Sequence, residues 1–314
     1  MPILRNAASV AVFFTGMLGA ADPRLVALAM PDATVIAGAN VTQAEASPFG
    51  QYVLTLIAPH GQELQALTAA TGFDPRKDIT ELLAVTNGGP ASGLVLARGA
   101  FPVEAISAAA GAAGASTETY NGATILKSPN GAQALVFLDA TLVAFGDPAS
   151  VKAAIDRQLP DAQHLSAAVV SRIEQLSGAN DAWVLTTVSP AGLRLPSAAP
   201  AVPGMIVQAL QQVQQASLAV KLDANVTVAA QAQLDTSQNA TALAGVLQLV
   251  ANMAQMQAQK APEAAAFAKS VSVAASGSTV TIAFSMPEAQ MQQLAAPRSH
   301  AAGHSSLWNG QQRH

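Results

Sequence analysis

Two histidines near the carboxyl terminus have a spacing that occurs in metal sites. His300 and His304 lie four residues apart, which on a helix would place both imidazoles on one face. Gly303 between them, and the Ser, Gly and Gln content of the segment 297–314, instead indicate a disordered tail. Together with His314, the pair could bind a transition metal only loosely. We therefore predict neither a metal site nor a bound cofactor.

The densest charge cluster of the chain could supply acid–base pairs if it lay in a cleft. The cluster consists of Asp74, Arg76, Lys77, Asp78 and Glu81. Asp74 directly precedes Pro75, as a helix-capping residue does, and the charges alternate in sign. We interpret the cluster as a capped helix start with a charged outer face. Asp147 before Pro148 is interpreted in the same way.

The chain lacks the sequence motifs of serine nucleophiles and phosphate loops. Neither Ser92 nor Ser276 lies in a glycine–serine–glycine elbow. Gly88-Gly89-Pro90 is not followed by Lys and a hydroxyl residue, so it predicts a turn. His60 and His164 are isolated and are expected at exposed loop positions. We predict no catalytic residue and a protein that is not an enzyme.

Composition and charge exclude several classes of protein. The net charge is -4 without a basic cluster, which gives no electrostatic footprint for nucleic acid and disfavours binding to an anionic membrane surface. Charged residues make up 11%, against about 25% in an average soluble domain. The chain has no cysteine, so it can form no disulfide. Its cores must therefore be held by burial, with small side chains, mainly alanine, packed closely.

The first 21 residues have the three parts of an export signal. Arg5 precedes the apolar run Ala7–Leu18, and the small residues Gly19-Ala20-Ala21 follow. The apolar run is shorter than the roughly 20 residues that a spanning helix needs. We expect cleavage after Ala21 and a periplasmic or extracellular protein that begins at Asp22. The alternative is that the leader stays attached as a membrane anchor.

Apolar periodicity and turn residues predict alternating helices and strands in residues 22–160. The expected order is a strand over 34–40, a helix from Ser47-Pro48, a helix over 62–70, a helical turn opened by Asp74-Pro75 with Ile79, Leu82 and Leu83 on one side, a strand over 94–97, a helix over 103–113, a strand over 120–126, a hairpin of strands 134–138 and 141–145, and a helix from Pro148 through Ile155.

Residues 161–296 repeat this alternation. The expected order is a helix over 165–176, a strand over 181–186, a helix over 205–215, a long hairpin over 216–234, a helix over 239–257, strands over 271–274 and 280–284, and a helix over 288–295. Asp32-Ala33 and Asp181-Ala182 precede comparable strands. We therefore predict an α+β fold of two related modules, 22–160 and 161–296, with antiparallel sheets and helices packed on one face. One continuous sheet is the alternative.

The longest predicted helix is apolar over more than a narrow stripe. Its apolar positions are Leu243, Val246, Leu247, Leu249, Val250, Met253 and Met256. Such a helix is expected to be buried on two sides, by a sheet and by another helix or a partner chain. Met253 and Met256, with Met286 and Met291, are expected in the core, and an adaptable apolar groove is the alternative.

Several segments of the first module resemble a group of exported, uncharacterised bacterial proteins, many of them from Acidobacteria. These segments are Pro31-Asp32-Ala33, Ser47-Pro48-Phe49-Gly50, the run from Gly72 to Ile79, Gly146, and Val151 to Asp156. The resemblance implies export, an α+β fold and no assigned activity, so it assigns no site residue.

The function expected from the sequence is that of an exported, non-catalytic binding or interaction protein. Its partner would be an unknown protein or small molecule, with no nucleic acid and no stable membrane insertion after the leader is removed. Two alternatives remain: a hydrolase whose site is assembled only in the fold, and a periplasmic carrier of a hydrophobic molecule.

Overall fold

The computed structural model describes residues 20–57, 61–89, 92–190, 211–258 and 269–295. The first part of the chain forms strands β1 (Val35–Asn40), β2 (Ile79–Thr86), β3 (Gly93–Gly99), β4 (Ser116–Tyr120), β5 (Ala123–Lys127), β6 (Ala134–Phe137) and β7 (Leu142–Gly146). Its helices are α1 (Pro23–Ala27), α2 (Val41–Ala46), α3 (Pro48–Ile57), α4 (Gly61–Thr71), α5 (Pro75–Asp78), α6 (Val103–Ala112) and α7 (Pro148–Asp156).

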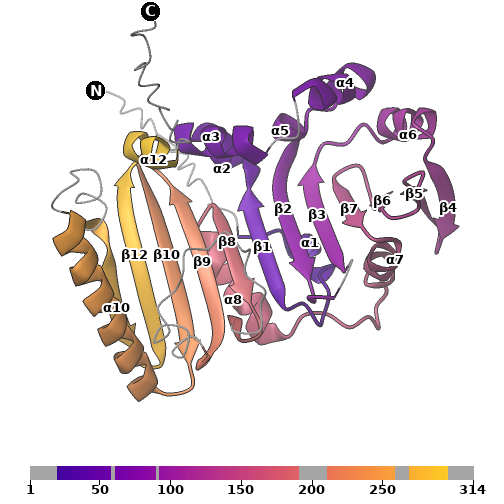
Figure 1. Cartoon of the computed structure of the whole chain (residues 1–314). Coiled ribbons are helices and arrows are strands. Elements are labelled where there is room, and N and C mark those ends of the chain that lie inside the picture. The colour runs from indigo at the N-terminus through magenta and orange to yellow at the C-terminus, as the bar shows by residue number, and fades with distance from the viewer. Residues whose placement is uncertain (1–19, 58–60, 90–91, 191–210, 259–268, 296–314) are drawn as a thin grey trace, which may run out of the picture.

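The second part begins with helix α8 (Ala167–Ala179). It contains strands β8 (Ala182–Thr186), β9 (Val213–Leu222), β10 (Asn225–Leu234), β11 (Ser272–Ser276) and β12 (Thr279–Pro287), and helices α10 (Ser237–Ala258) and α12 (Glu288–Ala295). All of these strands join one antiparallel sheet in the order β11-β12-β10-β9-β8-β1-β2-β3-β7-β6-β5-β4 (Figure 1). The α+β class is thus confirmed, and the two parts share a single sheet.

The chain follows the same path through both parts of the sheet. From the central pair β1 and β8, each part runs outward through three neighbouring strands, β1-β2-β3 in one and β8-β9-β10 in the other. A helix follows, α6 or α10, and antiparallel strands then return to the third strand: the meander β4 to β7, whose last strand pairs with β3, and the hairpin β11–β12, whose second strand pairs with β10. Asp32-Ala33 and Asp181-Ala182 therefore introduce equivalent strands, which pair antiparallel at the centre. Ser47, before α3, also donates to Glu288 of α12 at 2.5 Å and links the two parts at one end.

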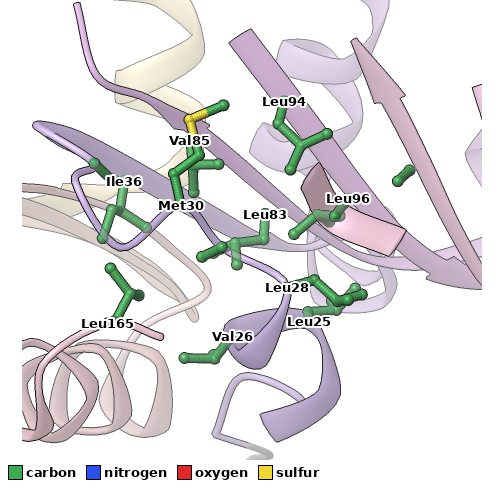
Figure 2. Close-up of a cluster of buried hydrophobic side chains, with 14 of the residues drawn as sticks. Leu25, Val26, Leu28, Met30, Ile36, Leu83, Val85, Leu94, Leu96 and Leu165 are labelled. Carbon is green, nitrogen blue, oxygen red and sulfur yellow. The ribbon is translucent and has the colours of Figure 1, made fainter. Parts of the chain in front are cut away.

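Helices cover both faces of the sheet, because central strands are apolar on both sides. Leu83 and Leu96 point toward α1, α7 and α8, where they join the largest core (Figure 2). Their chain neighbours Leu82 and Ala97 point the opposite way, toward Phe73 and Phe101 near α4 and α6. We call the α1 and α8 side the first face and the α4, α6 and α10 side the second face. Burial of this kind stabilises by roughly 25 cal/mol for each Å² of apolar surface.

The helical turn predicted after Asp74-Pro75 is wrong in its extent. Asp74 does cap a helix, α5, but that helix ends at Asp78, and Ile79 begins β2. Leu82 and Leu83 do not share one side, since they lie on opposite faces of the sheet. A central strand buried on both faces reads as a continuous apolar run, which periodicity alone cannot separate from a helix.

Further differences concern strands that lack a strong apolar pattern. The segment 120–126 is part of a hairpin, in which β4 and β5 meet at Asn121 and Gly122 with φ of 47° and 80°. The polar strand β4 gave no signal in the sequence. Residues 213–215 of the helix expected over 205–215 belong to β9, and Gln211 and Gln212 form a turn before it, so this part of the prediction is wrong. Residues 205–210 lie outside the described residues.

The long helix α10 is buried on one side only within the described structure. The helix runs alongside the strands at this end of the sheet (Figure 1). Its sheet-facing residues Leu243 and Ala244 pack on Val213, Leu234 and Val280 of the second face. Farther along the helix, Leu249, Val250, Met253 and Met256 are exposed. The expected second covering element is therefore not among the described residues, and the core positions predicted for Met253 and Met256 are wrong. Met286 is buried as expected, at 4% exposure, and Met291 is half-buried.

The centre of the sheet requires a glycine beneath a tryptophan. Gly38 on β1 pairs with Trp183 on β8, and a Cβ at position 38 would lie 2.4 Å from Cζ2 of Trp183. The indole is buried at 4% exposure, so it has little room to move. We predict that Gly38→Ala lowers the free energy of unfolding by about 1–3 kcal/mol through overpacking.

The measurement for this prediction is urea unfolding followed by circular dichroism. Gly93→Ala is the matched control, because Gly93 also lies in the sheet but a Cβ there meets no atom within 4 Å. An equal effect of the two substitutions would contradict the proposed contact with the indole.

Candidate functional site

A pocket of about 390 Å³ opens on the first face of the sheet, between α8 and the strands of the second part. Most of its lining side chains are amides or hydroxyls, so we call it the amide-rich pocket. Its lining comprises Ala168, Ser171, Arg172 and Gln175 of α8 with Leu185, Gln215, Ala216, Ser217, Gln231, Gln233 and Thr279 of the sheet.

The pocket is polar because β9 and β10 have one apolar and one polar face. On β9 the small residue Ala216 packs under α10 on the second face, and its neighbours Gln215 and Ser217 point to the first face. Register pairs Ser217 with Gln231 and Gln215 with Gln233 across the two strands. Opposed residues of an antiparallel pair lie close together, so the register gathers these side chains on one surface.

Helix α8 places a cation over this polar surface. The Arg172 guanidinium donates from Nη1 to Oε1 of Gln175 at 3.2 Å, and from Nη2 to Oγ of Ser217 at 3.2 Å and to Oε1 of Gln231. Within the described part of the chain, these partners are all uncharged and Arg172 forms no ion pair. A guanidinium held by neutral oxygens keeps its charge for an anionic ligand.

Hydrogen bonds also order the far wall of the amide-rich pocket. Gln233 donates from Nε2 to Oγ of Ser278 at 2.6 Å and accepts at Oε1 from Oγ1 of Thr279 at 2.7 Å. Amides and hydroxyls both donate and accept, which suits a ligand with several hydroxyl groups. Among its described lining residues the pocket contains neither a carboxylate nor a histidine.

A second pocket, of about 320 Å³, lies where the chain enters the fold. We call it the amino-terminal pocket, because Ala20 and Ala21 form part of its wall. The other lining residues are Ala39, Asn40, Thr42, Gln43, Thr80, Glu81, Arg98, Ser177, Asn180, Asp181 and Trp183.

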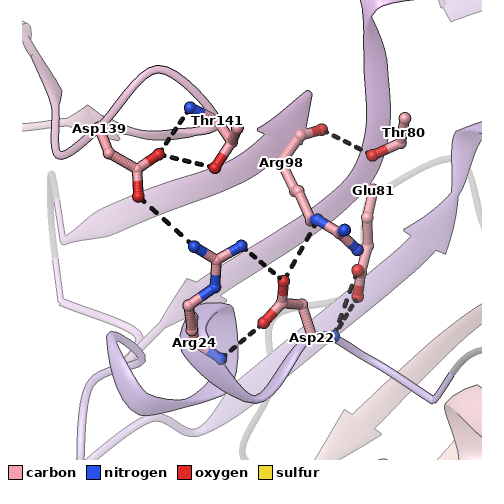
Figure 3. Close-up of polar contacts among 7 residues, drawn as sticks. All are labelled: Asp22, Arg24, Thr80, Glu81, Arg98, Asp139 and Thr141. Atoms are coloured by element: carbon pink, nitrogen blue, oxygen red, sulfur yellow. Dashed lines mark hydrogen bonds and ion pairs between the residues drawn. The ribbon is translucent and has the colours of Figure 1, made fainter. Parts of the chain in front are cut away.

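Asp22 is fixed beside the amino-terminal pocket by its side chain. Its carboxylate accepts from the backbone N of Arg24 at 2.8 Å, which caps α1, and it pairs with the guanidinium groups of Arg24 and Arg98, each at 3.3 Å. Arg24 in turn pairs with Asp139 at 3.4 Å (Figure 3). These contacts hold the start of α1 against β3 and the turn between β6 and β7.

The Glu81 carboxylate binds the main chain at the same point. Its Oε1 and Oε2 accept from the backbone N of Asp22 at 3.0 and 3.2 Å (Figure 3). Burial raises the pKa of the Glu81 carboxyl above its ordinary value, and the nearby negative charge of Asp22 adds to this, while the Asp22 amide and Arg98 oppose it. Among the described residues, no side-chain cation lies within ion-pair distance of Glu81.

The other carboxylate of this pocket is also committed to structure. Asp181, 3% exposed, pairs with Nζ of Lys221 at 3.0 Å and accepts from the backbone N of Leu222 at 2.7 Å. Glu81 and Asp181 thus each have internal partners, an arrangement that offers little for acid–base catalysis by the pair. Neither pocket is the apolar cavity that a hydrophobe carrier would need.

The structure separates Glu81 from the other members of the charge cluster that lie together in the sequence. Asp74 caps α5 and pairs with Arg76 at 2.9 Å, and a hydrogen bond from the Arg76 side chain lowers the pKa of Asp74. Asp78 accepts from the backbone N of Asp74 at 2.7 Å. The interpretation as a capped helix start is confirmed for these residues. Glu81 departs from it, because its carboxylate belongs to the amino-terminal pocket.

The remaining candidates have the structural roles that the sequence favoured. Asp147 caps α7 by accepting from the backbone N of Ala149 and Ser150. Ser92 donates to the carbonyl of Gly89 within a turn, and Ser276 ends β11. His164 is exposed, with Nδ1 2.9 Å from the carbonyl oxygen of Ala27. His60, His300, His304 and His314 lie outside the described residues.

Sequence reasoning did not single out Arg172, Gln231 or Gln233. Their common signal is weak: polar residues alternate with alanine along β9 and β10, which is also the pattern of an ordinary solvated face. The position of α8 beside that face could not be derived from spacing. In the described part of the chain, no cluster of three or more potential ligands could hold a metal ion. No described helix has the length and apolar character to cross a membrane.

The fold is similar to that of TP0453 in three crystal forms. Crystal form I aligns with a TM-score of 0.54 and 9% identity over 88% of this chain and 98% of that one. Form III gives 0.56 and 9% over 86% and 96%, and form IV gives 0.52 and 8% over 87% and 96%. No protein-family model and no curated protein sequence matches the chain. At this identity the likeness concerns the fold alone.

The buried pair at the amino-terminal pocket gives a testable prediction. Asp181→Ala removes the partner of Lys221 and the acceptor of the Leu222 amide, so the free energy of unfolding should fall by about 1–3 kcal/mol. The measurement is denaturant unfolding at neutral pH. The control is Asp223→Ala, at the exposed turn between β9 and β10. This substitution should change the free energy of unfolding by no more than about 0.5 kcal/mol. Similar losses of unfolding free energy in the two variants would contradict the role assigned to Asp181.

Proposed function

We propose that the protein is an exported, non-catalytic binding protein and that the amide-rich pocket holds its ligand. The observation that carries this proposal is the Arg172 guanidinium, which α8 holds over a surface of glutamine amides and hydroxyls without a carboxylate partner. The volume of about 390 Å³ is within the range of small-molecule sites.

The chemistry of the lining favours a small, hydroxyl-rich molecule that carries one carboxylate, such as a sugar acid. A guanidinium matches the geometry of a carboxylate and binds it by charge-assisted hydrogen bonds. Gln215 and Gln231 from adjacent strands offer donors and acceptors for hydroxyl groups. Binding rather than turnover is supported by the absence of a general base from the described lining.

Export is supported by the leader, and cleavage at the predicted point would leave the described fold intact. The predicted cleavage point after Ala21 lies directly before Asp22, whose side chain begins α1 and anchors it to β3. All described strands and helices lie after this point. A chain that begins at Asp22 thus keeps every described element of the fold.

Arg172→Gln is the direct test of the ligand proposal. Calorimetric titration of the chain with galacturonate and other sugar acids should show binding, and the neutral sugars of the same skeleton should bind more weakly. Loss of the charge-assisted bond costs about 1.5–3 kcal/mol, so Arg172→Gln should weaken binding of the acid roughly 10- to 100-fold.

The control for this test is Lys77→Gln, which removes one positive charge at an exposed position of α5. It should leave the affinity unchanged. If acids and neutral sugars bound equally well, or if neither series bound, the ligand class proposed for the amide-rich pocket would be wrong.

The export proposal has its own test in a bacterial host that carries the full chain. Intact mass measurement of the exported protein should give a chain that begins at Asp22. Ala21→Gln places a large polar residue before the cleavage point, so most of the chain should keep its leader. Met17→Leu, a conservative change within the apolar run, should be processed normally. Recovery of the protein in the cytoplasm with its leader intact would contradict export.

A further inference from the structure

We propose that cleavage between Ala21 and Asp22 creates an α-ammonium group that pairs with the Glu81 carboxylate, and that this pair stabilises the processed chain. The inference rests on the processing that the proposed function includes. It adds a specific acceptor for the new amino terminus, at a position that a leader motif alone does not indicate.

The geometry of the acceptor is already present in the unprocessed chain. Both oxygens of Glu81 lie near the backbone N of Asp22, at 3.0 and 3.2 Å, which is a suitable distance for an ammonium–carboxylate pair (Figure 3). In the unprocessed chain this nitrogen is an amide with one hydrogen. After cleavage the same nitrogen carries a full positive charge and three donors.

Among the residues that the structure describes, Glu81 has no cationic side chain within ion-pair distance. Arg98, the nearest basic residue of the pocket wall, pairs with the side chain of Asp22 instead, at 3.3 Å. The carboxylate is half-buried and stands beside a second carboxylate, an environment that raises its pKa. A new positive charge at the Asp22 nitrogen would supply what this environment lacks.

Asp22 has contacts of its own that fix its position. Its side chain caps α1 and pairs with Arg24 and Arg98, so the nitrogen should stay beside Glu81 when Ala21 is removed. Ala21 is 6% exposed in the fold and its N donates to Oγ of Ser177 at 2.9 Å. Because Ala21 is packed and hydrogen-bonded in the folded chain, we expect cleavage to precede folding, as it does for a leader removed during export. Loss of Ala20 and Ala21 also enlarges the amino-terminal pocket.

The pair should be sensitive to pH in a defined direction. An α-amino group has an ordinary pKa of about 7.7–8.0, and a carboxylate partner raises it. As long as Glu81 is ionised, the contribution to stability is therefore full below the ordinary pKa of the amino group and is lost as the pH rises through the raised value. The charged groups around this point are Glu81 on β2, Arg98 on β3, Asp181 before β8, and Asp22 and Arg24 at α1, while α8 contributes only the neutral Ser177 and Asn180.

The test uses chains with a defined first residue, so it does not depend on processing in a host. A chain that begins at Asp22 is released from an amino-terminal ubiquitin fusion, and its α-amino group is labelled with a trace of acetylating reagent across a pH series. Mass spectrometry of the amino-terminal peptide gives the extent of labelling at each pH, and hence the midpoint pH at which the α-amino group loses its proton. We expect the midpoint to lie about one pH unit or more above that of Glu81→Gln. Glu104→Gln, an exposed carboxylate on α6, should not move it.

A second measurement distinguishes an ion pair between Glu81 and the new amino terminus from a structural role that Glu81 would have in any chain. At pH 7, Glu81→Gln should lower the melting temperature of the chain that begins at Asp22. The same substitution should have no such effect in a chain that begins at Gly19, where the nitrogen is an amide. An equal midpoint in the parent and in Glu81→Gln, or an equal melting loss from both starts, would overturn the inference. An exported chain with another first residue would instead contradict the proposed processing.

Discussion

Pairing of β1 with β8 is the interaction on which the rest of the structure depends. These short strands are adjacent at the centre of the sheet although about 150 residues separate them, and their register places Gly38 beside Trp183. Without a cysteine, the contact must be held by main-chain hydrogen bonds and close packing. The glycine leaves room for the indole, and the indole closes the core between the two parts. Both polar pockets lie along this junction, since each includes a residue of β8, Leu185 in one and Trp183 in the other.

The two pockets differ in the side chains that meet beside α8 on the first face. In the second part of the chain α10 packs on the second face, and α8 lies on the first face beside β8. The polar residues of β9 and β10 are therefore left beside α8, which contributes Arg172. At the other pocket, the start of the chain crosses β2 and β3, and the charges of Asp22, Glu81 and Arg98 meet there. One site thus offers a cation without an ion-pair partner among the described residues, and the other holds a half-buried carboxylate for which we propose a new amino terminus as the partner.

Local patterns were enough to predict most of the elements. Capping residues followed by proline, Asp74-Pro75 and Asp147-Pro148, marked helix starts correctly, and alternation predicted the hairpin of β9 and β10. The short helices α1 and α2 were not predicted, and two further elements were missed for physical reasons. The apolar run of β2 is buried on both faces and resembles a helix, and β4 is too polar to stand out. The sites were harder still, because Arg172 and Gln231, or Asp22 and Glu81, are far apart in sequence and meet only through the order of the strands.

The most direct test of the central junction is hydrogen–deuterium exchange of the folded chain, followed by mass spectrometry of its peptides. If β1 and β8 join the two parts, peptides that cover 35–40 and 182–186 should be among the slowest to exchange. They should also open together, at the free energy of global unfolding. Faster exchange of the 182–186 peptide than of peptides from both β2 and β10 would show that the parts open independently, and would contradict a single continuous sheet.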